Sequence, residues 1–264
     1  MSSKTISLTT DFGLKDPYVA EIKAVILTIC PTSTIVDITH EVEKFSVRMG
    51  AFMLASAAPY FSKGTVHLGV VDPGVGTQRR PIIVETEQSF FVGPDNGLLI
   101  LAAEAQGIKQ MRVIESRRLM LPHVSNTFHG RDIFSPVAAH IANGVSLEEF
   151  GPQITDVVKP EFTRVIRTTD SLAGEVLHVD DFGNIITNIR SKEIAAFHES
   201  VIQVVFQSHP PRQMKVSMTY ADTKPQEPLA LIGSHQYLEI ALNQGNAART
   251  FFVKAGDKIT LSKT

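Results

Sequence analysis

An aspartate, an arginine and a histidine stand in two polar segments that could together activate a water molecule. Asp72 and Arg79 delimit the loop Asp72-Pro73-Gly74-Val75-Gly76-Thr77-Gln78-Arg79, across which they could return to each other as a charged pair. His129 opens an expected helix, and its near-neutral titration makes it a candidate proton acceptor. Each feature also has a structural alternative, a stiffened loop or a solvated histidine. No metal is expected, because His129 has no helical His-x-x-x-His or cysteine partner.

Two further segments carry side chains that could bind a nucleoside or an amino acid. Asp11 follows the first expected strand, where its carboxylate could accept hydrogen bonds from both ribose hydroxyls or could close a turn before Gly13. Asn184 lies between two expected strands, in Asp180-Asp181-Phe182-Gly183-Asn184. Its amide would suit the edge of adenine or an amino-acid carboxylate, although the segment could simply be a hairpin loop. The same ambiguity applies to residues 232–243, which contain Ser234.

The composition is that of a soluble globular protein. Of 264 residues 43% are hydrophobic, and 25 Lys and Arg against 27 Asp and Glu give a net charge of −2. This balance offers no electrostatic footprint for nucleic acid or for a membrane surface. Cys30 is the only cysteine, which favours a reducing compartment. The acidic Asp11 comes too early for a signal peptide, and residues 137–141 are too short for a membrane span. We therefore expect a cytoplasmic protein.

Strand-like and helix-like segments alternate in the first half of the chain. Asp16 and Pro17 indicate a helix start, Pro31 indicates its end, and Ser46 is expected to cap a second helix. Further helices are expected at residues 98–105 and 133–142. Strands are expected at residues 6–8, 34–38, 65–71, 81–84, 89–92 and 111–114. This α/β order predicts a mostly parallel sheet sandwiched by helices, with its ligand crevice at the carboxyl ends of the strands.

The second half contains short strands and no convincing long helix. The strands are expected at residues 174–179, 185–189, 201–206, 214–218, 229–232, 237–241 and 258–261. Turn residues between them favour a small antiparallel β-barrel-like domain. We therefore expect an α/β domain at 1–158, a linker at 159–167 and a β domain at 168–264.

Taken together, these segments resemble, in order and over nearly the whole chain, the S-adenosyl-L-methionine hydroxide adenosyltransferase family, the hydrolytic relatives of the fluorinase and chlorinase. Six in-order segments are far more specific than any one of them. They are Thr9-Thr10-Asp11-Phe12-Gly13, Val71-Asp72-Pro73-Gly74-Val75-Gly76-Thr77, Gly93-Pro94-Asp95-Asn96-Gly97, His129-Gly130-Arg131-Asp132, Asp181-Phe182-Gly183-Asn184, and the stretch from Gly233-Ser234 to Asn243.

The resemblance implies a role for each candidate residue. Asp11 matches the residue that holds the ribose hydroxyls, and Asp180 and Asn184 match residues that contact the methionine portion. Ser234 lies in the equivalent substrate-contacting turn, and Phe128 is also expected to bind substrate. The hydrolytic branch carries an Asp, an Arg and a His at the positions of Asp72, Arg79 and His129, which are therefore the expected catalytic residues. His235 and Leu242 depart from the fluorinase, which has arginines at these two positions.

The implied reaction is hydrolysis of S-adenosyl-L-methionine to adenosine and L-methionine by in-line attack of water or hydroxide on ribose C5′. The sulfonium already makes C5′ electrophilic, so no cofactor is expected. A homotrimer with active sites between subunits is implied as well. Two alternatives remain: halide-dependent adenosyl transfer, which the carboxylate of Asp72 would oppose by repulsion, and a non-catalytic adenosine-binding protein. The residues leave open whether Arg79 or His129 handles the proton.

Overall fold

The structure is a computed structural model that describes residues 4–195, 201–206 and 210–263. The chain divides into two compact units, Met1–Lys159 and Pro160–Thr264. In the described part of the chain, no helix is long and apolar enough to cross a membrane.

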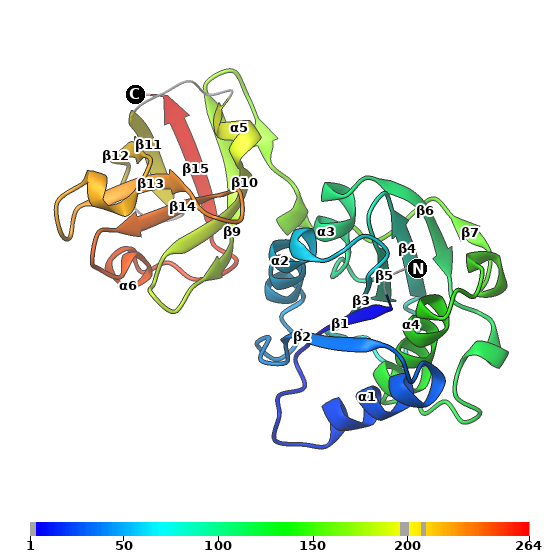
Figure 1. Cartoon of the computed structure of the whole chain (residues 1–264). Coiled ribbons are helices and arrows are strands. Elements are labelled where there is room, and N and C mark those ends of the chain that lie inside the picture. The colour runs from blue at the N-terminus through cyan, green and yellow to red at the C-terminus, as the bar shows by residue number, and fades with distance from the viewer. Residues whose placement is uncertain (1–3, 196–200, 207–209, 264) are drawn as a thin grey trace. The chain divides into compact units, whose positions relative to one another are not determined.

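A seven-stranded sheet with the order β2-β1-β3-β5-β4-β6-β7 forms the centre of the first unit (Figure 1). Its pairings leave β1, β2, β3, β5 and β6 running in one direction, with β4 and β7 opposed. The predicted mostly parallel sheet is therefore confirmed. The strands are β1 (Thr5–Thr10), β2 (Thr34–Thr39), β3 (Val66–Val70), β4 (Pro81–Thr86), β5 (Phe90–Pro94), β6 (Ile108–Val113) and β7 (Gln153–Ile154).

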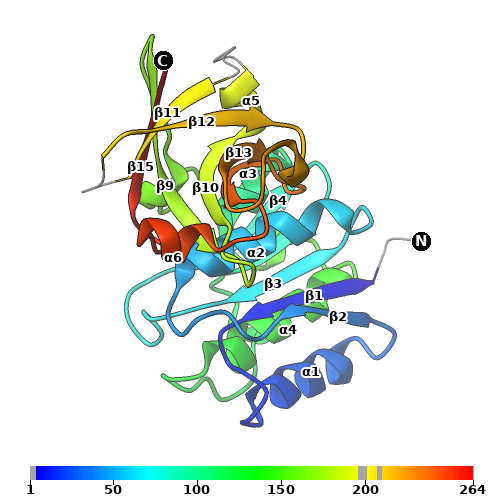
Figure 2. The same cartoon turned by 90° about the vertical axis from the view of Figure 1, so that its left-hand side faces the viewer.

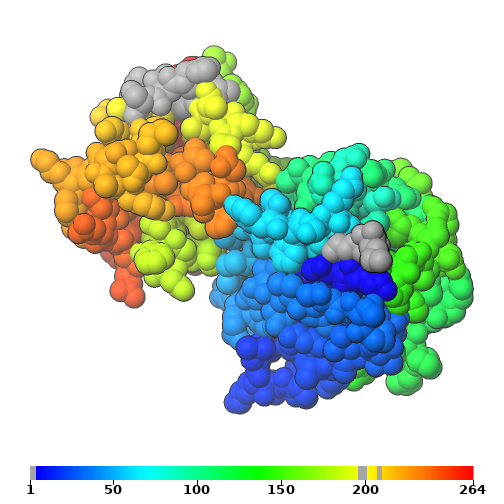
Figure 3. All heavy atoms as spheres, viewed as in Figure 1, coloured from blue at the N-terminus to red at the C-terminus, as the bar shows by residue number. Residues whose placement is uncertain are grey.

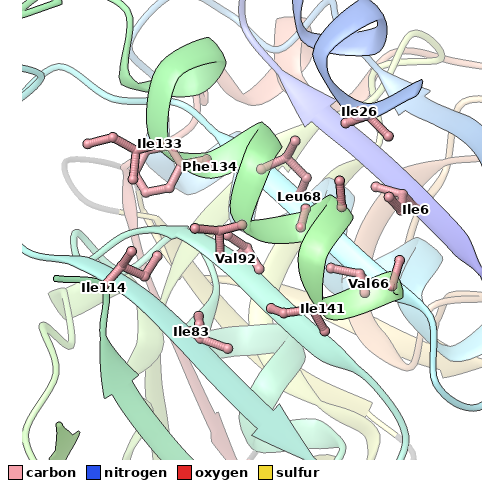
Figure 4. Close-up of a cluster of buried hydrophobic side chains, with 14 of the residues drawn as sticks. Ile6, Ile26, Val66, Leu68, Ile83, Val92, Ile114, Ile133, Phe134 and Ile141 are labelled. Atoms are coloured by element: carbon pink, nitrogen blue, oxygen red, sulfur yellow. The ribbon is translucent and has the colours of Figure 1, made fainter. Parts of the chain in front are cut away.

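Helices cover both faces of this sheet, α1 and α4 on one side and α2 and α3 on the other (Figure 2). The helices are α1 (Tyr18–Ile29), α2 (Val47–Ala57), α3 (Ile100–Ala105) and α4 (Ser135–Ala142). Alternate strand residues such as Ile6 and Leu8 point toward α1 and α4, because successive side chains of a strand face opposite sides. Figure 4 shows this core, in which Phe134 is fully buried.

Short helical turns fill several connections. They are η1 (Ala58–Tyr60), η2 (Arg117–Leu119), η3 (Gly130–Phe134), η4 (Leu147–Glu149), η5 (Glu161–Thr163) and η6 (Tyr220–Asp222), of which η3 is a π-helix. The space-filling view shows the blue N-terminal part of the first unit against its green C-terminal part (Figure 3), as the packing of α1 on α4 requires.

Helix starts follow the sequence in one case and differ from it in another. Ser46 caps α2 as predicted, since its hydroxyl accepts a hydrogen bond from the main-chain N–H of Met49. Asp16 does not cap α1, because the helix begins one residue later than expected and Pro17 occupies the N-cap position without a side-chain bond. The helix expected at residues 133–142 is preceded by η3, which carries the helical path back to Gly130.

The second unit is a barrel of seven strands closed by the pairing of β9 with β10. Neighbouring strands within the barrel pair antiparallel, except β12 and β13, which run parallel. The predicted barrel is thus confirmed, and its apolar interior contains Leu172, Leu238 and Ile240. The elements are β8 (Ile166–Arg167), β9 (Ser171–Val179), β10 (Ile185–Arg190), β11 (Val201–Phe206), β12 (Arg212–Ser217), β13 (Pro228–Ile232), β14 (Tyr237–Leu242) and β15 (Lys258–Lys263), with α5 (Ser191–Ala195) and α6 (Ala247–Phe251).

Candidate active site

The carboxyl ends of β1 and β3 border a hollow of about 70 Å³ in the first unit. A parallel sheet presents ligand-binding groups at this edge. The hollow is lined by Asp11, Phe12, Phe45, Val70, Asp72, Val75, Thr127, Phe128, His129 and Gly130. The fold therefore gathers four predicted site residues from three distant stretches of chain. Within residues 4–195, 201–206 and 210–263, no three His, Cys, Asp or Glu side chains form a group that could hold a metal ion.

Asp11 is held at the hollow by main-chain and lysine donors. The residue is 7% exposed, and its Oδ2 atom accepts a hydrogen bond of 2.9 Å from the main-chain N–H of Phe45. Lys44 donates to the main-chain oxygen of Asp11. Phe45 adopts a positive φ of 66°, a conformation that costs free energy for a residue with a side chain and tends to occur at functional sites. The orientation of the carboxylate is thereby set before any ligand binds.

Asp72 and Arg79 form a nearly buried ion pair. The Nε atom of Arg79 lies 3.0 Å from each carboxylate oxygen of Asp72, and its Nη2 atom lies 2.5 Å from Oδ2. Their side chains are 6% and 10% exposed, respectively. The loop between them depends on Gly76, at φ 77°, because a Cβ there would lie 2.3 Å from the carbonyl oxygen of Asn126. A side chain at that position would push residues 72–79 away from the segment that leads to His129.

His129 completes this arrangement through its contact with Arg79. The Nη2 atom of Arg79 lies 2.8 Å from Nδ1 of His129. A guanidinium can only donate, so Nδ1 is the acceptor and the neutral ring carries its proton on Nε2. Burial, followed by the charge of Arg79, lowers the pKa of His129 below its ordinary value of 6.5. The structure therefore places a buried ion pair beside a neutral imidazole.

The π-helix η3 fixes the direction of His129, which immediately precedes it. Asp132 is fully buried and accepts a hydrogen bond of 2.8 Å from the main-chain N–H of Ser125. The hydroxyl of Ser135 donates a hydrogen bond of 2.7 Å to the main-chain carbonyl of Gly130. π-Helices are rare and often occur at functional sites, because the wider turn reorients the residues around it.

Phe128 belongs to a cluster of aromatic rings beside the hollow. Its ring centroid lies 5.6 Å from that of Phe12 and 5.2 Å from that of Tyr18, in edge-to-face geometry. The guanidinium carbon of Arg131 lies over the face of the Phe128 ring, 5.0 Å from its centroid. A Cβ on Gly130 would lie 3.2 Å from the ring of Phe12 and 3.3 Å from that of Phe128, so these rings pack closely around Gly130 and form an apolar wall.

The other predicted site residues lie in the barrel unit. Asp180 organises the β9–β10 turn, accepting hydrogen bonds of 2.8 Å from the main-chain N–H and 2.9 Å from the side-chain amide of Asn184. Ser234 lies in the β13–β14 turn. In the β10–β14 pair Ile185 faces Ile240, so the two turns flank this pair from opposite ends. Asp180 and Asn184 are therefore hydrogen-bonded to each other in one turn, whereas Ser234 lies in a different turn.

Two residues that the sequence did not single out lie near the predicted ones, Glu239 in the barrel unit and Phe45 in the first unit. Glu239 is 6% exposed and accepts a hydrogen bond of 2.8 Å from the Tyr220 hydroxyl. Burial raises the pKa of Glu239, and the charge of Asp180 adds to this effect, while Tyr220 and His235 oppose it. A carboxylate inside the apolar run Tyr237-Leu238-Glu239-Ile240-Ala241-Leu242 is the signal that could have identified it. Phe45, exposed and beside Asp11, left no such signal.

The chain is similar to known proteins over nearly its whole length. The family model described as SAM hydroxide adenosyltransferase N-terminal domain matches residues 6–151, and that of the C-terminal domain matches residues 174–260. The (R)-S-adenosyl-L-methionine hydrolase of Salinispora tropica is 39% identical over 97% of each chain. A fluorinase of an Actinoplanes species is 26% identical, over 98% of this chain and 97% of its own.

A solved structure extends the likeness to the fold. The crystal structure of an uncharacterized conserved protein from Thermotoga maritima superposes with a TM-score of 0.88 at 40% identity, covering 98% of this chain and all of that one. Both domain models and full-length similarity at these identities lead to one conclusion. The chain belongs to the SAM hydroxide adenosyltransferase family.

Proposed function

We propose that this protein hydrolyses S-adenosyl-L-methionine to adenosine and L-methionine. The observation that carries this proposal is the Asp72–Arg79–His129 set at a hollow that also contains Asp11. Relatives named (R)-S-adenosyl-L-methionine hydrolase, at 35% to 39% identity over nearly the full chain, support the same reaction.

Asp11 holds the ribose in this proposal. One of its carboxylate oxygens is engaged by the N–H of Phe45, and the carboxylate keeps further lone pairs for the two ribose hydroxyls. Fixing the ribose fixes C5′, and displacement requires the nucleophile, C5′ and the departing sulfur to lie in line. Positioning is therefore the largest contribution to catalysis that the hollow can offer.

Arg79 and His129 prepare the nucleophile. The positive charge of Arg79 favours hydroxide over water at a site where unaided water, with a pKa of about 15.7, is a poor nucleophile. In the tautomer that the Arg79 contact imposes, Nε2 of His129 carries a proton and can donate a hydrogen bond to the attacking oxygen. Asp72 holds Arg79 in place through both of its carboxylate oxygens.

Halide-dependent adenosyl transfer is the alternative that this hollow disfavours. A halide entering it would approach the carboxylate of Asp72, which lines the hollow, and like charges repel strongly at a buried site. A non-catalytic binder, for its part, would have no use for the buried Asp72–Arg79–His129 set.

The test is to incubate the purified protein with S-adenosyl-L-methionine in water labelled with oxygen-18, with and without chloride. Adenosine and methionine should form, the label should appear at the 5′-hydroxyl, and chloride should neither enter the product nor raise the rate. A 5′-chloro nucleoside would assign the protein to the halogenating reaction. Unconverted S-adenosyl-L-methionine that stays bound would make it a binding protein.

We further propose the assembly and setting of this reaction. The enzyme acts as a cytoplasmic homotrimer without a cofactor, and has neither nucleic acid nor membrane as a partner. Each substrate is bound by the first unit of one subunit and the barrel of its neighbour, where Asp180, Asn184 and Ser234 contact it. The resemblance to the family and the single cysteine, Cys30, support this picture.

A further inference from the structure

A second and larger hollow lies on the other side of the Asp72–Arg79 pair. It measures about 450 Å³, and its wall includes Arg79, Glu115, Arg117, Asn126, His129 and Ile133. Asp72 lines only the small hollow, Arg79 lines only the large one, and His129 lines both. The ion pair and the imidazole therefore form the partition between two spaces.

The proposed reaction makes a route across this partition useful. When water attacks, its oxygen bonds to C5′, the C5′–S bond breaks, and its electron pair stays on the sulfur of methionine. The cationic substrate and neutral water thus yield adenosine, zwitterionic methionine and one proton. That proton has to leave a site whose small hollow is filled by the ribose.

His129 cannot keep this proton. Its Nδ1 atom faces the N–H of Arg79, and Nε2 is already protonated in the neutral ring. A second ring proton would place an imidazolium against a guanidinium, and burial, followed by the charge of Arg79, lowers the pKa of His129. The proton must therefore pass to solvent, and His129 is the side chain that lines the hollows on both sides.

The walls of the larger hollow suit water. Glu115, Arg117 and Asn126 are exposed polar residues, and the apolar wall includes Ile114 and Ile133, which Figure 4 shows at the edge of the core. About 30 Å³ per water molecule leaves room for several waters here. Such waters could accept a proton at the partition and exchange it with bulk solvent.

We propose that the larger hollow is the route by which water and protons move between the active site and solvent. It opens to solvent on the side of His129 away from the small hollow, while the substrate closes the small hollow. This inference rests on the proposed hydrolysis and adds a second, separate passage to it. Asn126 is a wall residue of this passage, and neither Asp11 nor Asp72 contributes to it.

The test compares Asn126→Phe, which fills the passage, with Asn126→Ala, which removes the same amide without filling it. Asn126→Phe should bind S-adenosyl-L-methionine with an unchanged Kd but lower kcat at least about fivefold, whereas Asn126→Ala should stay within about twofold of the wild type. The solvent deuterium isotope effect on kcat should rise only in Asn126→Phe, because proton departure then limits the rate. A merely structural disturbance would not raise this isotope effect.

A second pair, Glu115→Trp and Glu115→Ala, repeats the comparison from another side of the hollow if Asn126→Phe does not fold. Equal kcat and equal isotope effects within both pairs would overturn the proposal. Loss of substrate binding in the filling variants would overturn it too, since the hollow would then hold part of the substrate. The proposed function fails differently, by the wild type forming no adenosine.

Discussion

At the scale of single residues, hydrogen bonds within the site determine which group donates and which accepts. Asp72 accepts from Arg79, Arg79 also donates to His129, and His129 is left with a proton on Nε2. Charge-assisted bonds of this kind are shorter and stronger than neutral ones. The chain of donors therefore determines which atoms remain available to water and substrate.

Asp11→Ala should weaken substrate binding by about 2–4 kcal/mol, because both ribose hydroxyls lose a charged acceptor. The measurement is the Kd of S-adenosyl-L-methionine beside that of its 2′-deoxy analogue. Removing the 2′-hydroxyl should cost much less in Asp11→Ala than in the wild type. An equal cost in both proteins would show that Asp11 does not bind the ribose.

The pH profile of kcat should report the lowered pKa of His129. Since burial and Arg79 depress this pKa, the imidazole stays neutral as the pH falls to its ordinary value of 6.5 and becomes protonated only at lower pH. The acidic limb of kcat should therefore lie below pH 6.5. In Arg117→Gln, which removes another cation that lowers this pKa, the limb should move to higher pH. If the limb does not move, His129 is not the group whose titration shapes the pH profile.

His67 should make the first unit sensitive to acid. It is fully buried on β3, its Nδ1 lies 2.6 Å from the hydroxyl of Ser7, and burial lowers its pKa to about 4. The unfolded chain binds the proton near pH 6.5 and the folded chain does not. Stability from this group is complete above pH 6.5 and falls on the order of 3 kcal/mol as the pH drops toward 4.

The check for His67 is urea unfolding of the wild type and His67→Leu at several pH values and one protein concentration. The free-energy difference between them should shrink as the pH falls from 7 to 4.5. A constant difference would mean that His67 is not the titrating group.

At the scale of elements, the strand ends and their connections hold the functional side chains. The π-helix η3 directs His129, and the loop after β3 returns Arg79 to Asp72. In the barrel, Glu239 of β14 lies under the β12–β13 connection. A Cβ on Gly233 would lie 1.7 Å from its Oε1 atom, so the turn that carries Ser234 requires glycine there.

Tyr220→Phe should destabilise the barrel unit by about 1–3 kcal/mol, because the buried carboxylate of Glu239 loses its hydrogen-bond donor. Thermal and urea unfolding measure this loss. Tyr60→Phe is the matched control, since Tyr60 is 76% exposed, and should be nearly neutral. In a Glu239→Gln background the cost of Tyr220→Phe should fall, and an unchanged cost would place the effect elsewhere.

At the scale of the whole molecule, the proposed site divides its residues between two units. Asp11, Asp72, Arg79, Phe128 and His129 belong to the first unit, whereas Asp180, Asn184 and Ser234 belong to the second. A symmetric oligomer can complete such a site from neighbouring subunits, since each interface then repeats around the axis.

Subunit mixing tests this assembly. Asp72→Ala and Asn184→Ala chains should each be nearly inactive alone, yet their co-assembled mixture should regain about one quarter of the sites, because a random ring pairs two intact halves that often. Sedimentation of the mixture checks for trimers. If each site lay within one subunit, every mixed site would carry a defect and no activity would return. A fully active monomer would contradict the trimer itself.

Local sequence patterns predict much of this fold. The helical spacing after Pro17, the cap at Ser46 and the short strands of the barrel depend on residues a few positions apart, so periodicity and turn chemistry predicted them. The predicted start of α1 was one residue too early, because Pro17 occupies the N-cap position and no side chain caps the helix. The order of the motif segments also pointed to the family and hence to its reaction.

The tertiary structure decided what distant residues do to one another. The sequence left the proton role of Arg79 and His129 open, and only their 2.8 Å contact assigns the acceptor to Nδ1. Likewise, only the folded chain brings the N–H of Phe45 to Asp11 and the hydroxyl of Tyr220 to Glu239. Local preferences determine which elements form, whereas the protonation and orientation of a buried group depend on whichever neighbours the topology delivers.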